Sequence, residues 1–262
     1  MSFSPLEWPT LVWNKAEWSN FDVFRDCSDE PQVLARAVVD ELTRWTLPPP
    51  PDVHLLDYGA EPGGRLAELL RGRLGSYSPV PLASNAEASD FLTRLTASGR
   101  GAACDAVLFC HVLPYVRRPD LVLAALAEDC SPGAVAVAVG LESHGDQQDI
   151  VDRAHESEPA HPRRFDHILH LDRWLATNGI PRRRRVVWSR VRAADEQTLR
   201  RVLEFIIGCD DERLVDRAAA AVPRSPGGTW VIRSAHGVVS WPLRLHRVSK
   251  TPVPITATQP DG

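Results

Sequence analysis

A glycine-rich turn after a short apolar segment is the first place in this sequence where chemistry could occur. It lies within the run His54-Leu-Leu-Asp57-Tyr-Gly59-Ala-Glu61-Pro-Gly63-Gly64. Glycine lets the backbone approach a ligand closely, and a helix that begins at such a turn presents free N–H groups. The spacing differs from the GxGxxG of dinucleotide sites, and the run lacks the GK[ST] of a phosphate-binding loop. Small residues would also serve simply to pack a strand against a helix, so this turn alone does not define a ligand.

A second group of candidate residues follows a later apolar segment. It lies within the run Asp105-Ala-Val-Leu-Phe109-Cys110-His111-Val-Leu-Pro-Tyr115-Val. Because imidazole titrates near neutral pH, His111 could position or deprotonate a nucleophile. The alternative is that His111 caps the end of a strand and forms only local hydrogen bonds. Both candidate groups follow apolar segments, so the strands would decide where they lie.

Short apolar segments alternate with helix-compatible ones through the middle of the chain. We expect strands at 53–58, 80–83, 106–112 and 134–139, separated by helices at 65–71, 86–95 and 121–127. Strands that are apolar along their whole length are usually buried on both faces. The pattern therefore predicts an α/β fold with a parallel sheet and helices on both of its faces.

The last part of the chain is less regular. We expect helices at 149–154, 165–177, 196–207 and 212–221, a strand at 186–191, and a final hairpin formed by 229–234 and 238–241. The two helices at about 195–222 then form an insertion before the final hairpin. Residues 249–262, rich in Pro and Thr, are expected to form a frayed tail.

The two candidate groups, taken together and in this order, resemble the class I S-adenosylmethionine (SAM)-dependent methyltransferase superfamily. The matching positions are Asp57, Gly59, Gly63, Asp105, His111, Tyr115, Pro132 and Gly133. The resemblance covers about residues 53–141 well and extends more loosely through 241. It implies a Rossmann-like class I methyltransferase fold within residues 51–248, with SAM as the cofactor and a small molecule as the substrate.

The resemblance also implies roles for individual residues. The methionine end of SAM would lie around Asp57, Gly59 and Gly63. At the carboxyl end of the 106–112 strand, Phe109, Cys110 and His111 would face adenosine or substrate. The catalytic candidates are His111 and Tyr115, although methyl transfer depends mainly on alignment, so a base is optional.

Residues 1–50 are expected to form a separate helical extension with a helix at 31–45. The prolines at 48–51 end that helix and form a stiff linker. In the superfamily, N-terminal extensions often cover the substrate pocket, so Trp8, Trp13 and Trp18 could form a lid. They could equally dock the extension onto the core or lie in a dimer interface.

Three departures from the superfamily pattern affect the cofactor site. Glu61 replaces the middle glycine of the turn, where a carboxylate would repel that of SAM unless it reached the amino group instead. Ala83, or at best Ser84 or Asn85, stands where an acid would hold the ribose hydroxyls, which forfeits a charge-assisted hydrogen-bonded pair. The span from Asn85 to Asp105 is too short for a full βαβ unit, so one strand–helix unit is expected to be missing.

Two function classes follow from these departures. In the favoured one, the chain is a structural or regulatory subunit with an impaired SAM site that partners an active methyltransferase, or another copy of itself. In the alternative, it is an active stand-alone SAM-dependent methyltransferase that acts on a nitrogen or oxygen atom of a small molecule. The helices at 196–221 and the Trp-bearing N-terminus are the surfaces expected to contact a partner.

Other classes of function find less support. The 262 residues carry 30 basic and 34 acidic side chains, a net charge of −4, which gives no reason to expect nucleic acid. Arg182–Arg185 is interpreted as a solvated strand entrance. No apolar run is long enough for a membrane span and the N-terminus does not resemble a signal peptide, so a cytoplasmic protein is expected.

Metal and disulfide chemistry is not predicted either. The five cysteines form no CxxC, so neither a zinc cage nor a disulfide framework is indicated. His167 and His170 would lie one turn apart on a helix, but no second ligand group with metal-site spacing accompanies them. No metal is therefore assigned from the sequence.

Overall fold

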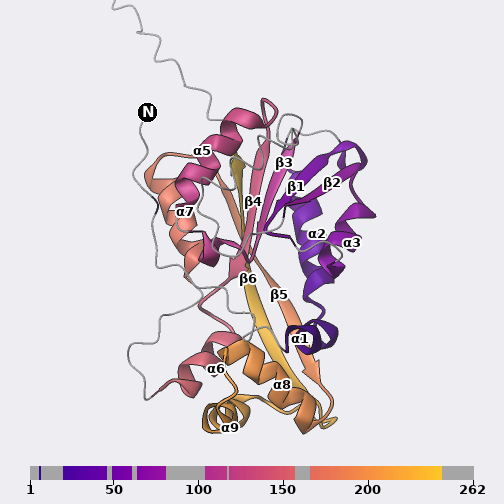
Figure 1. Ribbon diagram of the computed structural model, residues 1–262, viewed down its shortest axis with the longest axis vertical. Helices are drawn as coiled ribbons and strands as arrows, with labels where there is room; N and C mark the ends of the chain where they lie inside the picture. Colours follow the sequence, from indigo (N-terminus) through magenta and orange to yellow (C-terminus); the bar gives the residue numbers. More distant parts are fainter. Residues whose placement is uncertain are drawn as a thin grey trace, which may run out of the picture.

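A six-stranded sheet organises the computed structural model, which describes Leu6 and residues 20–45, 49–60, 64–80, 104–116, 118–156 and 166–243. Its strands are β1 (His54–Tyr58), β2 (Ser76–Val80), β3 (Ala106–Cys110), β4 (Val135–Leu141), β5 (Arg183–Ala193) and β6 (Trp230–Pro242). Their order is β2-β1-β3-β4-β6-β5. The first four are parallel, whereas β6 runs antiparallel to both β4 and β5. In Figure 1, β5 and β6 extend well beyond the other strands.

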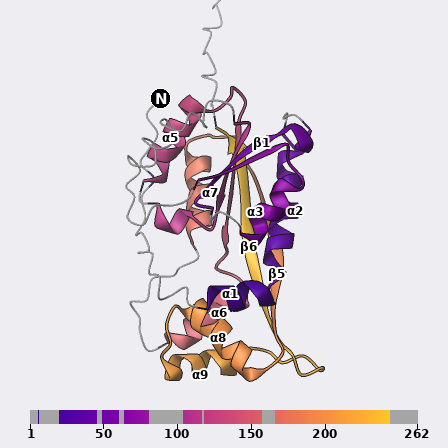
Figure 2. The ribbon, with the colours of Figure 1, turned by 45° about the vertical axis from the view of Figure 1, so that its right-hand side comes forward.

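Helices cover both faces of this sheet, as the sequence predicts. They are α1 (Phe21–Cys27), α2 (Glu30–Leu42), α3 (Arg65–Arg71), α5 (Pro119–Asp129), α6 (Asp146–Ala154), α7 (His167–Thr177), α8 (Glu196–Ile207) and α9 (Glu212–Ala221), with 3-10 turns η2 (Pro50–Asp52) and η4 (Leu113–Tyr115). Figures 1 and 2 show α2 and α3 on one face and α5 and α7 on the other. The predicted α/β architecture is confirmed.

The strands that build the centre of the sheet are the ones with continuous apolar sequence. All of β3 up to Phe109, and β4 from Val135 to Val139, is buried. An apolar strand of this kind gains by contact on both faces, so the helical layers on each side follow from the strand composition. The predicted strands at 53–58, 106–112 and 134–139 therefore correspond to β1, β3 and β4, with ends shifted by one or two residues.

Two apolar cores lie on the two faces of the sheet. On one face, Val122 and Leu126 of α5 and Leu171 of α7 are fully buried. On the other, Leu34 of α2 and Leu70 of α3 belong to a separate cluster that includes the inner strands. Because α2 packs against α3 and β5, this part of the N-terminal segment belongs to the covering layer of the sheet.

A third core lies beyond the end of the sheet, beneath the extended ends of β5 and β6. It is formed by α1, α6, α8, α9 and those two strand ends. We call this whole unit the cap. Phe24 of α1 packs on Phe205 of α8, with ring centroids 4.7 Å apart. Val191 of β5 and Ile232 of β6 complete this core. The predicted helical insertion at about 195–222 thus contributes α8 and α9 to the cap.

Local hydrogen bonds explain why the ends of α8 and α9 agree with the sequence prediction. The Asp195 carboxylate accepts a hydrogen bond from the backbone N–H of Thr198 at 2.8 Å, and Asp211 does the same for Arg213 at 2.9 Å. Gly208, with φ 72°, ends α8 in the left-handed conformation. Both helices therefore begin, and α8 also ends, on signals that are local in the sequence.

The second strand lies earlier than predicted. It was expected at 80–83, but β2 spans Ser76–Val80, paired with β1 from His54 to Tyr58. Pro79 is tolerated because, among the described strands, β2 is at the edge of the sheet. The predicted helix at 86–95 lies outside the described residues. So does most of the segment between β2 and β3, and the expected loss of one strand–helix unit remains a prediction.

The predicted final hairpin is wrong. β6 is a single 13-residue strand that pairs with both β4 and β5, and the residues expected to form its turn lie in the middle. Gly237 is required there for close packing, because a Cβ would collide with the Glu142 carboxylate and lie 3.0 Å from Cγ2 of Ile168. A glycine that suggests a turn in the sequence is in fact a site of close side-chain approach.

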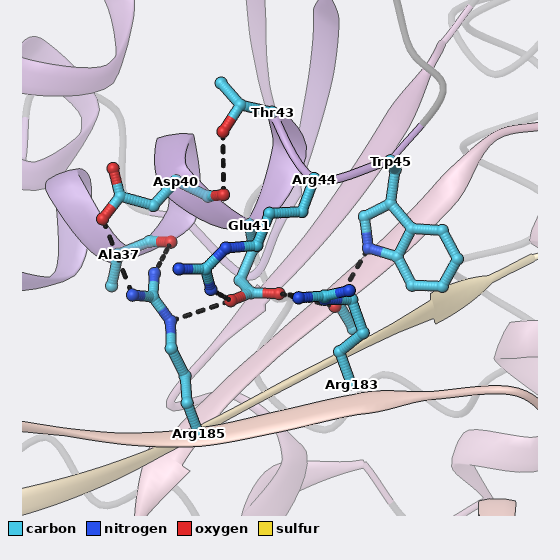
Figure 3. Close-up of polar contacts among 9 residues, drawn as sticks. Ala37, Asp40, Glu41, Thr43, Arg44, Trp45, Arg183 and Arg185 are labelled. Atoms are coloured by element: carbon cyan, nitrogen blue, oxygen red, sulfur yellow. Dashed lines mark hydrogen bonds and ion pairs between the residues drawn. The ribbon is translucent and has the colours of Figure 1, made fainter.

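The arginine run has partners that the sequence did not indicate. Arg183 and Arg185 of β5 point toward Glu41 of α2, whose side chain is 2% exposed (Figure 3). Nε of Arg185 lies 2.8 Å from Glu41 Oε1, and Arg184 donates to Glu142 at 2.6 Å. These arginines are therefore more than a solvated strand entrance, because they pair with buried acids that join α2 and the β4 end to β5.

No helix within the described ranges is long and apolar enough to cross a bilayer.

Candidate functional site

A cavity of about 490 Å³ lies at the carboxyl ends of β1, β3 and β4. The turn after β1, the segment after β3 and the start of α2 form its walls, and the cap closes one side. Its lining includes Phe21, Phe24, Glu30, Pro31, Asp57, Gly59, Ala60, Gly64, Tyr77, Cys110, His111, Tyr115, Gln147, Phe205 and Ile206. Parallel sheets commonly bind ligands at this edge, where several loops can contribute side chains.

The cavity brings together much of the site predicted from the sequence. Asp57, Gly59, Cys110, His111 and Tyr115 all line it. They come from the ends of neighbouring parallel strands β1 and β3, which pair in register. Because parallel strands end at the same edge, the two sequence groups converge without any long-range signal in the sequence.

Some predicted site residues are placed elsewhere. Phe109 does not line the cavity; it is 1% exposed and packs on Tyr58 in the core, with ring centroids 5.4 Å apart. Successive side chains on a strand point to opposite faces, so Phe109 cannot share the direction of Cys110. The predicted cofactor residues Glu61, Gly63 and Ser84 lie outside the described residues.

Asp57 is the buried acid of the cavity wall. Its side chain is 3% exposed, and the Tyr77 hydroxyl donates a hydrogen bond to Oδ2 at 2.5 Å. Burial raises the pKa of Asp57 to about 7, and the hydrogen bond from Tyr77 opposes that rise only in part. No arginine, lysine or histidine among the described residues forms an ion pair with it. The wall therefore presents a carboxyl group that would gain from a cationic ligand.

The turn after β1 gives backbone access to the same region. Gly59 has a φ of 88°, in the left-handed region that favours glycine. Its N–H donates to the carbonyl of Val80 at 2.7 Å, which ties the end of β1 to the end of β2. Gly59, Ala60 and Gly64 all line the cavity, so the backbone of this turn is open to a ligand.

One carboxylate and two imidazole side chains lie close together where α2, the end of β3 and β6 meet. Oε1 of Glu30 lies 3.3 Å from Nε2 of His111, and Oε2 lies 3.7 Å from Nε2 of His236. The two imidazole rings meet edge to face, with centroids 5.4 Å apart. His236 is fully buried and lies 2.7 Å from the Ser189 hydroxyl. We call Glu30, His111 and His236 the cavity triad.

Charge favours an ionised Glu30 in this cluster. Burial opposes its ionisation, but His236 and His111 beside it lower the pKa of Glu30 to about 2. Burial lowers the pKa of His236 to about 4, with Glu30 acting in the opposite direction. The cluster therefore holds a carboxylate next to a neutral His236 near neutral pH.

The backbone of His111 is also unusual. Its φ of 55° is the one positive value at a non-glycine residue among those that the structure describes. Its N–H still donates to the carbonyl of Val139 at 2.9 Å, as a continuation of the β3–β4 pairing. Strained conformations of this kind persist where the surroundings hold them, often at functional sites. The chain thus turns sharply at the residue that the sequence singled out.

Sequence reasoning missed two members of the triad. Glu30 resembles an ordinary acidic residue in the first turn of a helix, and His236 falls in the segment that was predicted as a hairpin turn. Treating 230–242 as one continuous strand would have placed His236 beside β4, but no spacing links it to Glu30 or His111. Their proximity depends on how three distant elements pack.

The cysteine in the wall has low reactivity. Burial, together with Asp57 and Glu30, raises the pKa of the Cys110 thiol well above its ordinary value. A thiol held in the protonated state is a poor nucleophile. Cys110 therefore contributes to the surface of the cavity rather than to covalent chemistry.

One of three comparisons with known proteins, the comparison with solved structures, finds similar proteins. No protein-family model and no curated protein matches the sequence. The solved structure of a candidate type II methyltransferase from Anaeromyxobacter dehalogenans matches with a TM-score of 0.51 and 16% identity, over 80% of this chain and 97% of that one. A candidate sarcosine dimethylglycine methyltransferase from Galdieria sulphuraria has a TM-score of 0.42 and 10% identity, over 86% and 98%.

A further match is the plantazolicin methyltransferase BamL, with a TM-score of 0.41 and 10% identity, over 87% of this chain and 88% of that one. Of these three structures, the first has the highest TM-score, and its likeness extends over nearly its whole length. The mixed sheet, its helical layers and this likeness together support one conclusion. The chain has the Rossmann-like fold of the class I SAM-dependent methyltransferases.

Proposed function

We propose that this chain binds SAM in the cavity and takes part in methyl transfer to a small molecule. The observation that carries the proposal is the buried carboxyl group of Asp57, which faces the cavity without a cation among its described partners. A buried acid gains most from a positively charged ligand group. The ammonium group at the methionine end of SAM is such a group.

The residues around Asp57 fit that end of the cofactor. Gly59 exposes backbone, and Tyr77 holds Oδ2 of Asp57 so that the other carboxylate oxygen remains available. SAM supplies an electrophilic methyl group on a sulfonium. What the chain supplies is alignment, since bringing the nucleophile into line with that methyl group accounts for much of the rate.

The other wall would hold the methyl acceptor. His111 and Tyr115 follow β3 and line the cavity, where they would position the nucleophile of the substrate. The cap contributes apolar surface from Phe21, Phe24 and Phe205. Apolar walls of this kind exclude water and favour a compact organic substrate.

Calorimetric titration with SAM tests the proposal. The wild-type chain is expected to bind with micromolar affinity, and Asp57→Asn, which keeps the shape but removes the charge, at least ~10-fold more weakly. Asp216→Asn, on the exposed surface of α9, is the matched control and should bind like the wild type. Equal affinity of wild type and Asp57→Asn would refute the role of Asp57.

One observation favours a second candidate, a subunit with an impaired SAM site. β2 ends at Val80, and the next residues are Pro81 and Leu82, so no acid directly follows this strand to hold ribose hydroxyls. Glu61 in the turn adds to this departure. In that case the chain alone shows no SAM binding, and adding a co-encoded methyltransferase produces activity that depends on both chains. If the chain alone does not bind SAM and the added methyltransferase restores no activity, both candidates are rejected.

A further inference from the structure

The cavity triad has the composition of a metal site. Two imidazoles and one carboxylate come from the start of α2, the segment after β3 and the middle of β6. One donor atom from each lies within 4.8 Å of the other two. We infer that Glu30, His111 and His236 bind a divalent first-row transition-metal ion at the wall of the cavity. The inference goes beyond the proposed function and does not depend on SAM.

The distances suit an ion between the three groups. Transition metals bind histidine nitrogen and carboxylate oxygen at about 2.0–2.2 Å, so neighbouring donors around one ion lie roughly 3–3.5 Å apart. The Glu30–His111 separation is 3.3 Å and the Glu30–His236 separation is 3.7 Å. The two histidine donors lie within 4.8 Å of each other, so side-chain rotations that bring them closer would place all three donors on one ion.

An unsatisfied atom at this place argues against a purely structural cluster. Nε2 of His111 is buried and lies 3.3 Å from Glu30, but it forms no well-aligned hydrogen bond with a described residue. Buried polar atoms in native proteins are nearly always paired, so each exception requires an explanation. An ion bound to Nε2 of His111 and to Glu30 would satisfy both groups. The left-handed backbone at His111 is a second sign that this ring is held in a special position.

The donor set indicates the class of metal. Two histidines and one carboxylate on one side of an ion leave several positions open, the arrangement found for iron(II) and related ions. Magnesium, which prefers oxygen donors, fits poorly. Glu30 and His111 line the cavity, so the open positions would face it. A small molecule with oxygen donor atoms could then bind the ion, with His111 acting as a ligand rather than as a proton acceptor.

The neighbouring hydroxyl group makes a specific prediction. Ser189 lies 2.7 Å from Nε2 of His236 and competes with an ion for that nitrogen. Both side chains are fully buried. Ser189→Ala frees the nitrogen with little change in volume, so this variant is expected to bind metal at least as tightly as the wild type.

The test is titration of the chelator-treated full chain with Co²⁺, followed by the visible absorption of the bound ion. We expect one ion per chain, and at least ~10-fold weaker binding in Glu30→Gln and in His111→Ala. These two side chains are partly exposed, so their replacement leaves the core intact, which circular dichroism verifies. His236 is fully buried, and its variant is not needed for the conclusion.

Two controls sharpen the outcome. His170→Ala removes an exposed histidine from the α7 pair that the sequence offered as an alternative, and it should bind Co²⁺ like the wild type. Mg²⁺ should not bind. The inference is overturned if the wild type does not bind Co²⁺, or if Glu30→Gln and His111→Ala bind it unchanged. The Co²⁺ titration contains no SAM, so its result can be interpreted even if the chain does not bind SAM.

Discussion

At the scale of single residues, the cavity contains an acid that the protein itself does not neutralise. Asp57 lies at the carboxyl end of β1, where the main chain places it in the wall of the cavity and the surrounding apolar strands exclude water. Its hydrogen bond from Tyr77 returns only part of the lost hydration. A group of this kind is costly for folding and useful for binding, since a cationic ligand restores the missing partner.

The raised pKa of Asp57 makes stability depend on pH. The carboxyl titrates at 3.8 in the unfolded chain and at about 7 in the folded one. Between these values the folded chain holds a proton that the unfolded chain releases, so the free energy of unfolding falls as the pH rises from about 4 to 7. The contribution is up to about 4 kcal/mol.

Urea denaturation of the wild type and of Asp57→Asn between about pH 4 and pH 7 measures the contribution of Asp57 to the free energy of unfolding. Other groups titrate in both proteins, so the difference between the two curves isolates Asp57. We expect the variant to gain stability relative to the wild type as the pH rises. A constant difference would show that Asp57 titrates normally in the folded chain.

At the scale of elements, one buried acid fixes α2 to the sheet. Glu41 of α2 forms ion pairs with Nε of Arg185 at 2.8 Å and with Nη1 of Arg44 at 2.6 Å (Figure 3). The Ser240 hydroxyl of β6 donates a hydrogen bond to Glu41 at 2.9 Å. Arg185 also donates a hydrogen bond to the backbone carbonyl of Ala37. This network positions α2, and therefore Glu30 at its first turn, against β5 and β6.

Removing the charge of Glu41 should loosen this attachment. Glu41→Gln keeps the shape but removes the buried anion of Arg185, which is then left with Asp40 at 3.6 Å. Because Arg185 is 25% exposed, solvent offsets part of the loss. We expect the free energy of unfolding to fall by about 2–3 kcal/mol, measured by urea denaturation. The exposed pair of Arg200 and Asp216 is the comparison, and Asp216→Asn should cost no more than about 0.5 kcal/mol. Equal costs would contradict a special role for Glu41.

At the scale of the whole molecule, the cavity lies between two bodies of structure with separate cores. The sheet and its covering helices supply Asp57 and His111, and the cap supplies Phe24 and Phe205. β5 and β6 run through both (Figures 1 and 2). Because each body has its own apolar cluster, opening of the cap need not disrupt the sheet.

Hydrogen exchange tests this separation. Phe24→Ala removes a buried ring that packs on Phe205, a change that costs about 3 kcal/mol in a core. Amides of α8 and α9 should then exchange faster, with those of β3 and β4 unchanged. Leu126→Ala, which removes a buried side chain of α5 from the core on the sheet, is the matched control and should affect the sheet side instead. Uniform acceleration in either variant would show one cooperative unit.

The strongest predictions from sequence concern features that neighbouring residues specify. The apolar runs of β1, β3 and β4 require burial on both faces, and the capping acids Asp195 and Asp211 mark the starts of α8 and α9. The resemblance to the methyltransferases implied one site for Asp57 and His111, and the common edge at which parallel strands end explains why the two residues meet there.

Other features depend on contacts between distant segments, and only the tertiary structure decided them. β2 takes its bounds from its pairing with β1, and Gly237 stays within a strand because Glu142 occupies the space where a side chain would go. The cavity triad forms only when α2 packs on the sheet beside β6, which places Glu30 between His111 and His236. Sequence periodicity records which face of an element is apolar, but it does not record which polar residues meet when those faces pack together.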